Sequence, residues 1–233
     1  MPLGASRAGL MSVAVDDIPD LGLDHLYWGP AIDDVSQDWE DQDGGLNTSP
    51  FGSPSLDAIN STQAVSYDGS GDYHSADSWS LGSSGEYTFA IVFEAASVDF
   101  SFPVSNGSTN GNSGWRFRIS DDGYQVGHPG VGSSGTQGTV DTDPHVAVGT
   151  FDGSNVIVDL DGVEIINESV GTPGSLSGDQ SFIAAREDND GNVADFFPGE
   201  IGAVGHEAVG SNSERRDEIT NELGSPFGIN TST

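Results

Sequence analysis

The sequence predicts an all-β protein, a sandwich built of short strands with one short helix near the C-terminal end. The 33 glycines, together with clusters of Ser, Asn and Asp, divide the 233 residues into runs of strand length. Several of these runs alternate apolar and polar residues, as half-buried strands do. Asp-Gly pairs stand between alternating runs, and they are the strongest short-range signal of a β-hairpin.

The clearest predicted strand is EYTFAIVFEA, residues 86–95, in which large apolar side chains recur at every second position. WRFRI, residues 115–119, repeats the pattern with its aromatic and aliphatic residues inward. Because alternate side chains of a strand point to opposite faces, we expect Arg116 and Arg118 to lie side by side on an exposed sheet face.

Three turns are predicted from Asp-Gly pairs. Those at 152–153 and 161–162 connect three alternating runs and predict consecutive hairpins. VSYDGSGDY, residues 65–73, predicts a further hairpin, with Gly69 and Gly71 supplying backbone of positive φ.

One stretch is helical in pattern: SNSERRDEITNELG, residues 211–224. Ser211 and Glu214 have the spacing of a capping box, and Gly224 is a natural C-terminal stop. These signals indicate a surface helix that closes the domain, and they say nothing of a partner.

The chain divides into an N-terminal arm, residues 1–20, and a domain, residues 21–233. The arm is rich in small residues and weakly periodic, so we expect it to need another molecule to order it. Sandwiches of about 200–250 residues commonly form one domain. We therefore expect residues 21–233 to form a single domain.

The charge is strongly one-sided: 37 acidic residues oppose six basic ones, and the formal net charge is -31 at pH 7. A nucleic-acid partner is excluded, because neutralising phosphates requires a basic patch. At molar salt the Debye length falls to about 3 Å, which screens the self-repulsion of such a surface. The sequence therefore indicates a protein of a halophile or its virus, and 34% hydrophobic residues indicate a folded core rather than disorder.

The sequence has no cysteine and therefore no disulfide framework. The segment MPLGASRAGLMSV lacks the apolar core of a signal peptide, and no run approaches the roughly 18 apolar residues of a membrane span. We expect no membrane insertion. The protein is expected either inside a cell or outside it by a route other than its own signal peptide, such as in a virus particle.

Five segments follow one another along the chain: QAVSYDGSGDYHSAD, EYTFAIVFEA, GWRFRISDDG, DPHVAVGTFDGSNVIVDLDGVEI and FFPGEIGAVGHEAVGSNSERRDEITNELG. Their order resembles the laminin-G-like, concanavalin A-like jelly-roll family of lectins and glucanases, over roughly residues 21–229. The resemblance implies two antiparallel sheets with one short C-terminal helix, and a packing or hydrogen-bonding role for His145. The sequence departs from the family at residues 159–161, where many members carry an aromatic residue.

Members of this superfamily often carry calcium, so the resemblance raises the possibility of an ion held by acidic loops. Two loops offer carboxylates, and calcium takes carboxylate and carbonyl oxygens. The alternative for both loops is an ordinary solvated turn, which is common in so acidic a chain. The candidate ligands are Asp68 and Asp72 in the first loop and Asp188, Asp190 and Asp195 in the second.

Lectin-like sites combine an aromatic face with polar loop side chains, and each candidate aromatic is weighed against burial in the core. The candidates for carbohydrate binding are Tyr73, Trp79, Trp115 and Tyr124, with Asn106 and Asn110 in a neighbouring loop. Catalysis is not expected. The Glu-x-Asp-x-x-Glu pattern of jelly-roll glucanases is missing, no histidine pair has metal-ligand spacing, and no serine has a nucleophile elbow.

These observations predict a non-enzymatic structural protein of a haloarchaeal virion, a capsid or tail decoration whose lectin-like domain contacts host surface glycans. The arm would bind other virion proteins, and a homo-oligomer on a symmetric particle is expected. Two alternatives stay open. One is an exported halophilic adhesin or glycosidase-related module that binds carbohydrate, and the other is a capsid cement protein that binds only other virion proteins.

Overall fold

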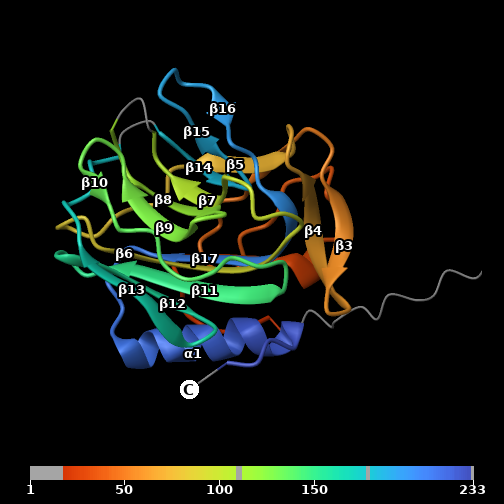
Figure 1. Ribbon diagram of the computed structural model, residues 1–233. Coiled ribbons are helices and arrows are strands. Elements are labelled where there is room, and N and C mark those ends of the chain that lie inside the picture. Colours follow the sequence, from red (N-terminus) through yellow and green to blue (C-terminus); the bar gives the residue numbers. More distant parts are fainter. Residues whose placement is uncertain (1–17, 109–111, 177–178, 232–233) are drawn as a thin grey trace, which may run out of the picture.

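The computed structural model describes residues 18–108, 112–176 and 179–231. Within them, two large antiparallel sheets pack face to face, and one α-helix covers the outer face of the larger sheet (Figure 1). This confirms the predicted all-β jelly-roll sandwich with a short C-terminal helix. The predicted arm lies outside the described residues except for residues 18–20.

The larger sheet has eight strands. Seven form the order β13 (Val163–Ser169), β12 (Asn155–Leu160), β11 (Pro144–Phe151), β6 (Tyr87–Ala95), β17 (Pro198–Glu207), β4 (Thr62–Asp68) and β3 (Ser55–Ile59), and β1 (His25–Trp28) pairs with β17. The smaller sheet has the order β10 (Gly132–Ser133), β9 (Gly123–His128), β8 (Trp115–Ser120), β7 (Ser101–Asn106), β14 (Gln180–Ile183), β5 (Tyr73–Asp77) and β2 (Ser49–Phe51).

A two-stranded hairpin, β15 (Arg186–Glu187) and β16 (Val193–Ala194), rises above the smaller sheet (Figure 1). The helix α1 spans Ser213–Gly224, and short 3-10 helices span Gly29–Ala31 and Ser225–Phe227. Among the described residues, no helix has the length and apolar character needed to cross a membrane.

The strand β6 shows how the sequence pattern builds the layers. Its odd-numbered aromatic and aliphatic residues, among them Phe89 and Phe93, face the core between the sheets. The smaller Ala90 and Val92 face the helix instead. Strand β6 is therefore buried on both faces, and the predicted alternation of residues 86–95 is confirmed.

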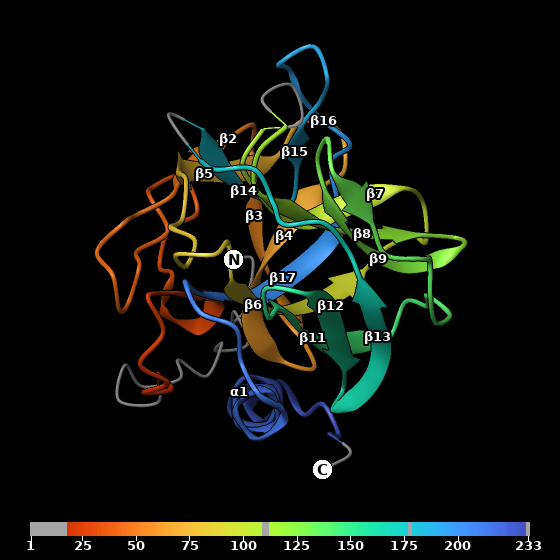
Figure 2. The same ribbon diagram turned by 90° about the vertical axis from the view of Figure 1, so that its left-hand side faces the viewer.

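Helix α1 packs along the outer face of the large sheet, as Figure 2 shows end-on. Its Ile219 and Leu223 are fully buried there. The predicted cap is wrong by one residue: Asn212 is the N-cap and its side chain accepts a hydrogen bond from the Arg215 backbone N–H at 2.9 Å. Ser211 is instead buried beneath the helix start, where its hydroxyl contacts that of Thr88.

The α-helix ends at Gly224, as predicted, but Gly224 keeps right-handed helical backbone and the chain continues into the second 3-10 helix. The left-handed residue that ends the helical segment is Gly228, with φ of 66°. Pro226, at the start of the short 3-10 helix, fits this continuation because its missing N–H needs no helical partner there.

The segment of residues 65–73 is not the predicted hairpin. Its two strands, β4 and β5, belong to different sheets, so the segment carries the chain from one layer to the other. The Asp68 carboxylate accepts the Ser70 backbone N–H at 2.8 Å, and Gly69 adopts a φ of 72°. Gly71 does not have positive φ, contrary to the prediction.

The two other Asp-Gly turns are hairpins as predicted, joining β11 to β12 and β12 to β13. In the second turn, Asp161 and Gly162 both have positive φ, at 52° and 79°. The Asp161 carboxylate lies 2.7 Å from His145 Nδ1, and Asp141 lies 2.9 Å from His145 Nε2. His145 therefore has the hydrogen-bonding role that the resemblance implies.

Candidate functional site

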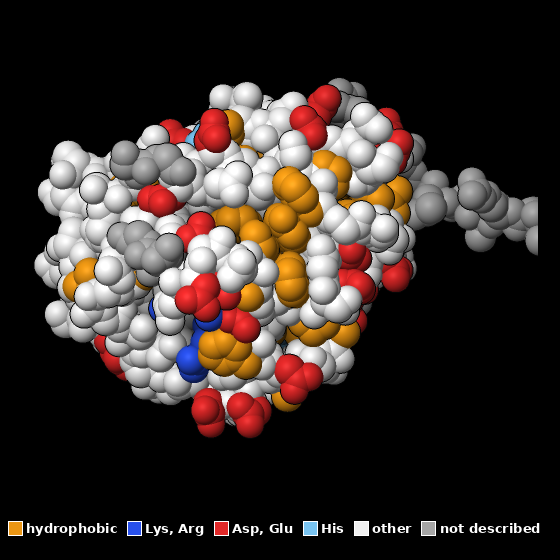
Figure 3. All heavy atoms as spheres, turned by 90° about the horizontal axis from the view of Figure 1, so that it is seen from above, with side chains coloured by type: hydrophobic (Ala, Val, Ile, Leu, Met, Phe, Trp, Pro, Cys, Tyr) orange, Lys and Arg blue, Asp and Glu red, His pale blue; other side chains and the backbone are white. Residues whose placement is uncertain are grey.

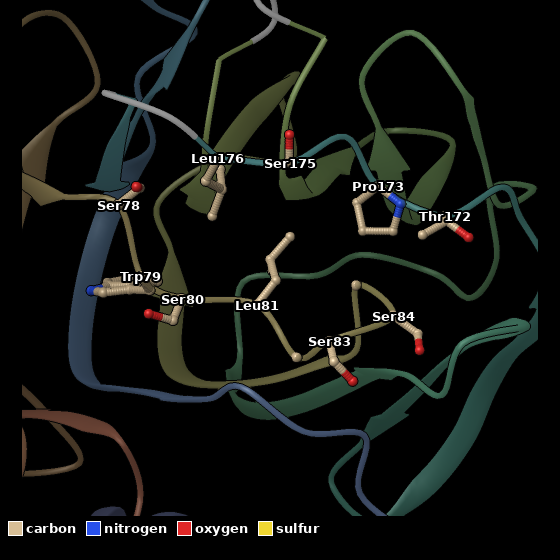
Figure 4. Close-up of a pocket in the computed structure, with 12 residues that line it drawn as sticks. Ser78, Trp79, Ser80, Leu81, Ser83, Ser84, Thr172, Pro173, Ser175 and Leu176 are labelled. Carbon is tan, nitrogen blue, oxygen red and sulfur yellow. The ribbon is translucent and has the colours of Figure 1, made fainter.

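A cavity of about 700 Å³ lies between two loops at one end of the sandwich. One loop joins β5 to β6, and the other precedes β14 (Figure 4). We call this cavity the loop pocket. Its lining consists of Ser78, Trp79, Ser80, Leu81, Gly82, Ser83, Ser84, Gly85, Thr172, Pro173, Ser175 and Leu176.

Backbone hydrogen bonds fix the shape of both loops. The Gly85 N–H donates to the Gly82 carbonyl at 2.9 Å, which closes a tight turn in the first loop, and Gly85 has a φ of 86° that favours glycine. The Gly114 N–H donates to the Gly174 carbonyl at 3.0 Å, which ties the second loop to the segment before β8. The pocket walls are thus held by the sandwich.

The loop pocket has an apolar middle and a rim of hydroxyls. In Figure 4 the side chains of Leu81, Leu176 and Pro173 face the space between the loops. The hydroxyl-bearing residues stand around that space, and most of them are exposed. Each hydroxyl can donate one hydrogen bond and accept two, so the rim can bond to many partners.

Trp79 and Asn106, two of the predicted sugar-binding residues, lie together at the base of the loop pocket. Trp79 is fully buried, and its indole N–H donates to Tyr27 at 3.2 Å. The Asn106 side chain bonds both the backbone N–H and the carbonyl of Trp79, at 3.1 and 2.9 Å. Both residues therefore shape the pocket from beneath and do not present a surface to a ligand.

The structure places two other predicted aromatic residues in the core. Trp115 is 1% exposed and stacks on Phe89 with ring centroids 4.8 Å apart. Tyr124 is fully buried and lies parallel to Phe117. Neither ring can stack on a sugar in this structure. Asn110 lies outside the described residues.

Tyr73 is the one predicted aromatic residue that reaches the surface. It is half-buried and stacks on Phe51, with ring centroids 4.6 Å apart and an angle of 3° between the planes. The Phe51 side chain is 43% exposed. The pair lies on β5 and β2, at the edge of the smaller sheet, and does not line the loop pocket.

The acidic residues proposed as calcium ligands do not form a ligand set. Asp68 caps its own turn, and Asp72 accepts the Ser53 backbone N–H at 2.6 Å. Hydrogen bonds, first from the Ser70 hydroxyl and then from its backbone, lower the pKa of Asp68. Among the described residues, no three His, Cys, Asp or Glu side chains lie close enough together to hold a metal.

The second acidic loop is the tip of the β15–β16 hairpin. The Asp188 carboxylate accepts the backbone N–H groups of Asp190 and Asn192, at 2.8 and 2.9 Å. Asp195 lies at the base of the hairpin and pairs with Arg186, while Asp190 is exposed. The oxygens of Asp188 and Asp195 thus already face donors, and calcium binding stays a prediction.

Four carboxylates lie around the β12–β13 turn, on Asp159, Asp161, Glu164 and Glu168. Asp159 is buried and pairs with Arg216 at 2.7 Å, whereas Asp161 bonds His145. Glu168 accepts the Gly135 backbone N–H at 2.6 Å. Glu164 lies 3.8 Å from Arg216 and shares that partner with Asp159. Asp161 and Glu168 have other partners.

Comparison with solved structures finds the same fold in proteins of low sequence identity. Domain 4 of the extracellular arabinanase of Geobacillus stearothermophilus, in complex with arabinotriose, matches with a TM-score of 0.63 and 11% identity, over 85% of this chain and 98% of that one. Trypanosoma rangeli sialidase in complex with sialic acid matches with a TM-score of 0.64 and 13% identity, over 93% of this chain and 35% of that one.

The binding domain of botulinum neurotoxin serotype D/C matches with a TM-score of 0.61 and 12% identity, over 87% of this chain and 52% of that one. This chain thus spans about a third of the sialidase and half of the toxin domain. No known family model matches the sequence, and no curated protein matches it. The comparisons show that the chain shares its β-sandwich fold with parts of these three proteins.

The loop pocket was not among the predicted sites. Its lining comes from residues 78–85 and 172–176, which are far apart along the chain. A weak signal was present, because both segments contain a Ser-Leu pair among serines and glycines, at 80–81 and at 175–176. An apolar residue inside a serine- and glycine-rich loop is unusual enough to indicate a surface that is not simply solvated.

Proposed function

We propose that this protein is a non-enzymatic, lectin-like module that binds a glycan in the loop pocket. The observation that carries the proposal is the apolar middle of that pocket, formed by Leu81, Leu176 and Pro173 and ringed by hydroxyls. Its volume of about 700 Å³ falls within the range of roughly 300–1,000 Å³ that is usual for ligand pockets.

The chemistry of the lining suits a sugar. A pyranose ring has apolar C–H faces and a girdle of hydroxyls, so it needs apolar contact in the middle of a site and hydrogen-bonding groups around it. The serine and threonine side chains of the rim provide both donors and acceptors. The lining carries no charged side chain, which favours a neutral sugar unit and a binding role over acid-base catalysis.

A substitution that fills the loop pocket tests the proposal. Ser175 is exposed at the rim, so Ser175→Trp should fill the space without disturbing the core. Ser154→Trp, in the exposed β11–β12 turn, is the matched control. We expect Ser175→Trp to lose at least about tenfold in affinity on a glycan array, and Ser154→Trp to bind as the unmodified protein does.

Tyr73→Ala separates the two surfaces. If this variant loses binding while Ser175→Trp retains it, the glycan binds on the Phe51–Tyr73 pair and the loop pocket is the wrong site. Hydrolysis of the bound glycan would contradict the non-enzymatic role and favour the glycosidase-related alternative.

The setting we propose is the surface of a haloarchaeal virus particle, as a capsid or tail decoration that contacts host glycans. The acidic composition supports a high-salt environment, and residues 1–20 would bind other virion proteins. A homo-oligomer would suit a symmetric particle. Mass spectrometry of purified particles tests this setting, and failure to find the chain there would end it.

A further inference from the structure

Three of the six basic residues of this chain lie together on one face of the molecule. Arg116 and Arg118 are on β8, whose alternate residues Trp115 and Phe117 enter the core, so both arginines point to the outer face of the smaller sheet, as predicted. Arg186 begins the hairpin that rises above that face. Figure 3 looks down on this side and shows arginine atoms grouped beside a hydrophobic side chain.

Aromatic rings hold the three guanidinium groups in place. Arg116 and Arg186 both lie over Phe102, with Cζ 5.8 and 4.8 Å from the ring centroid. Arg118 lies over Phe100 at 5.2 Å. Such contacts fix the planes of the guanidinium groups before any ligand arrives.

The arginines line a cavity of about 130 Å³, which we call the arginine cavity. It shares no residue with the loop pocket. Its volume is well below the roughly 300 Å³ at which pockets for whole drug-sized ligands begin, so it can take a small group and not a complete oligosaccharide. Its lining consists of Phe100, Phe102, Arg116, Arg118, Gln125, Gly127, Arg186 and Asn189.

The electrostatics of the arginine cavity differ from those of the other described arginines. Arg215 pairs with Glu207 and Glu218, and these acids raise its pKa. Burial, and then the positive charges of Arg186 and Arg118, lower the pKa of Arg116 to about 10. Three guanidinium groups therefore lie close together and partly desolvated here, although the chain has 37 acidic residues and only six basic ones.

The hydrogen-bond donors of Arg118 are not all satisfied by other groups of the described protein. Its Nη2 donates to the Thr136 hydroxyl at 3.3 Å, and its buried Nε has no hydrogen-bond partner among the described residues. Arg186 pairs with Asp195 at 2.5 Å, so the inference of an incoming anion rests on Arg118. A buried N–H donor without a partner costs free energy, and the described residues leave part of the Arg118 hydrogen-bonding capacity unused.

We propose that the arginine cavity binds a carboxylate or sulfate group, the anionic substituent of an acidic sugar. The planar guanidinium fork matches the two oxygens of such a group, and charge-assisted hydrogen bonds of this kind are about twice as strong as neutral ones. The surrounding acidic surface repels polyanions at long range, but molar salt screens that repulsion within about 3 Å, while contact pairs in a partly buried cavity are screened less. The site is independent of glycan binding in the loop pocket.

The test titrates the full-length protein in molar KCl with glucose, glucuronate, glucose 6-sulfate and potassium sulfate, using NMR shifts to measure affinity. We expect both acidic sugars to bind and glucose to leave the β8 signals unchanged. Arg118→Gln should weaken the acidic sugars by roughly tenfold, because the fork and its charge are lost. Arg118→Lys, which keeps the charge and not the fork, should weaken them less.

The matched control is Arg7→Gln, which removes the same charge elsewhere in the sequence and should leave the affinities unchanged. If free sulfate binds as tightly as glucose 6-sulfate, the arginine cavity does bind an anion, but its ligand is the free ion and not an acidic sugar. If no anion binds, or if Arg118→Gln binds the acidic sugars as the unmodified protein does, the cluster is only packing. Loss of glycan binding in Ser175→Trp bears on the loop pocket alone, so the two proposals fail separately.

Discussion

At the scale of single residues, His206 is a buried group that the fold tolerates only in its neutral form. It is 1% exposed on β17 and packs against the rings of Trp79 and Trp115, with centroids 5.4 and 6.1 Å away. Neither of its ring nitrogens has a hydrogen-bond partner among the described residues. Burial, and secondarily the nearby His25, lowers the pKa of His206 to about 3.

This predicts a specific loss of stability in acid. The pKa falls from 6.5 in the unfolded chain to about 3 in the folded one, so the stability is fully present above pH 6.5 and is lost as the pH falls toward 3. Between pH 6.5 and about 4.5 the loss should be about 2 kcal/mol, at about 1.4 kcal/mol per pH unit. His206→Phe should lack this part of the loss.

Urea unfolding of both proteins at the two pH values measures the difference, and each protein serves as its own reference. His74, whose pKa burial lowers to about 4, should leave a residual slope in the variant. Equal acid sensitivity of the two proteins would mean that His206 is hydrated or bonded in solution.

At the scale of elements, the connection between β4 and β5 decides how the two sheets are joined. Gly69 has a φ of 72°, and a Cβ added there would lie 2.7 Å from the Pro198 Cβ. Gly71, two residues on, has no atom within 4 Å of an added Cβ and no positive φ. We expect Gly69→Ala to cost about 1–2 kcal/mol of unfolding free energy and Gly71→Ala to cost little.

Denaturant unfolding of the two variants compares them directly. The pair is well matched because both glycines lie in one exposed loop and both receive the same methyl group. Equal costs would indicate that the turn relaxes, and that the crossing between the sheets does not depend on left-handed backbone at Gly69.

Sequence patterns predicted the strands and the helix better than they predicted which strands pair with one another. The alternation in residues 86–95 and the turn at 161–162 are local, so both were read correctly. Residues 65–73 have the same local pattern whether β5 pairs with β4 or joins the other sheet, so only the packing of the whole chain decides between them. The helix cap moved from Ser211 to Asn212 because burial of the Ser211 hydroxyl outweighs its capping propensity.

The same limit applies to the sites. Arg116 and Arg118 were correctly predicted to share the outer face of a sheet, because strand period alone requires it, but both are half-buried there. Arg186 joins them only through the β15–β16 hairpin, some 70 residues later. Trp115 and Tyr124 were candidate sugar platforms because an aromatic residue in a strand can face either way, and only the packed sandwich shows that both face inward.

At the scale of the whole molecule, the net charge of -31 should make stability depend on salt. Repulsion among surface carboxylates destabilises the compact state, and dissolved ions screen it. We expect the melting temperature to rise steadily from low to molar KCl. Potassium chloride is preferable to a sulfate salt, because sulfate strengthens apolar burial in any protein. A melting temperature that is constant across this range would contradict adaptation to high salt.

The most direct test of the account is binding of the purified protein to an array of defined glycans and to host surface glycans, in molar KCl with and without a chelator. We expect saturable binding that Ser175→Trp weakens by at least about tenfold and Ser154→Trp leaves unchanged. Loss of binding on chelation would indicate that a bound divalent cation supports glycan binding. If no glycan binds with or without the chelator, the central claim is wrong and the jelly roll is a scaffold.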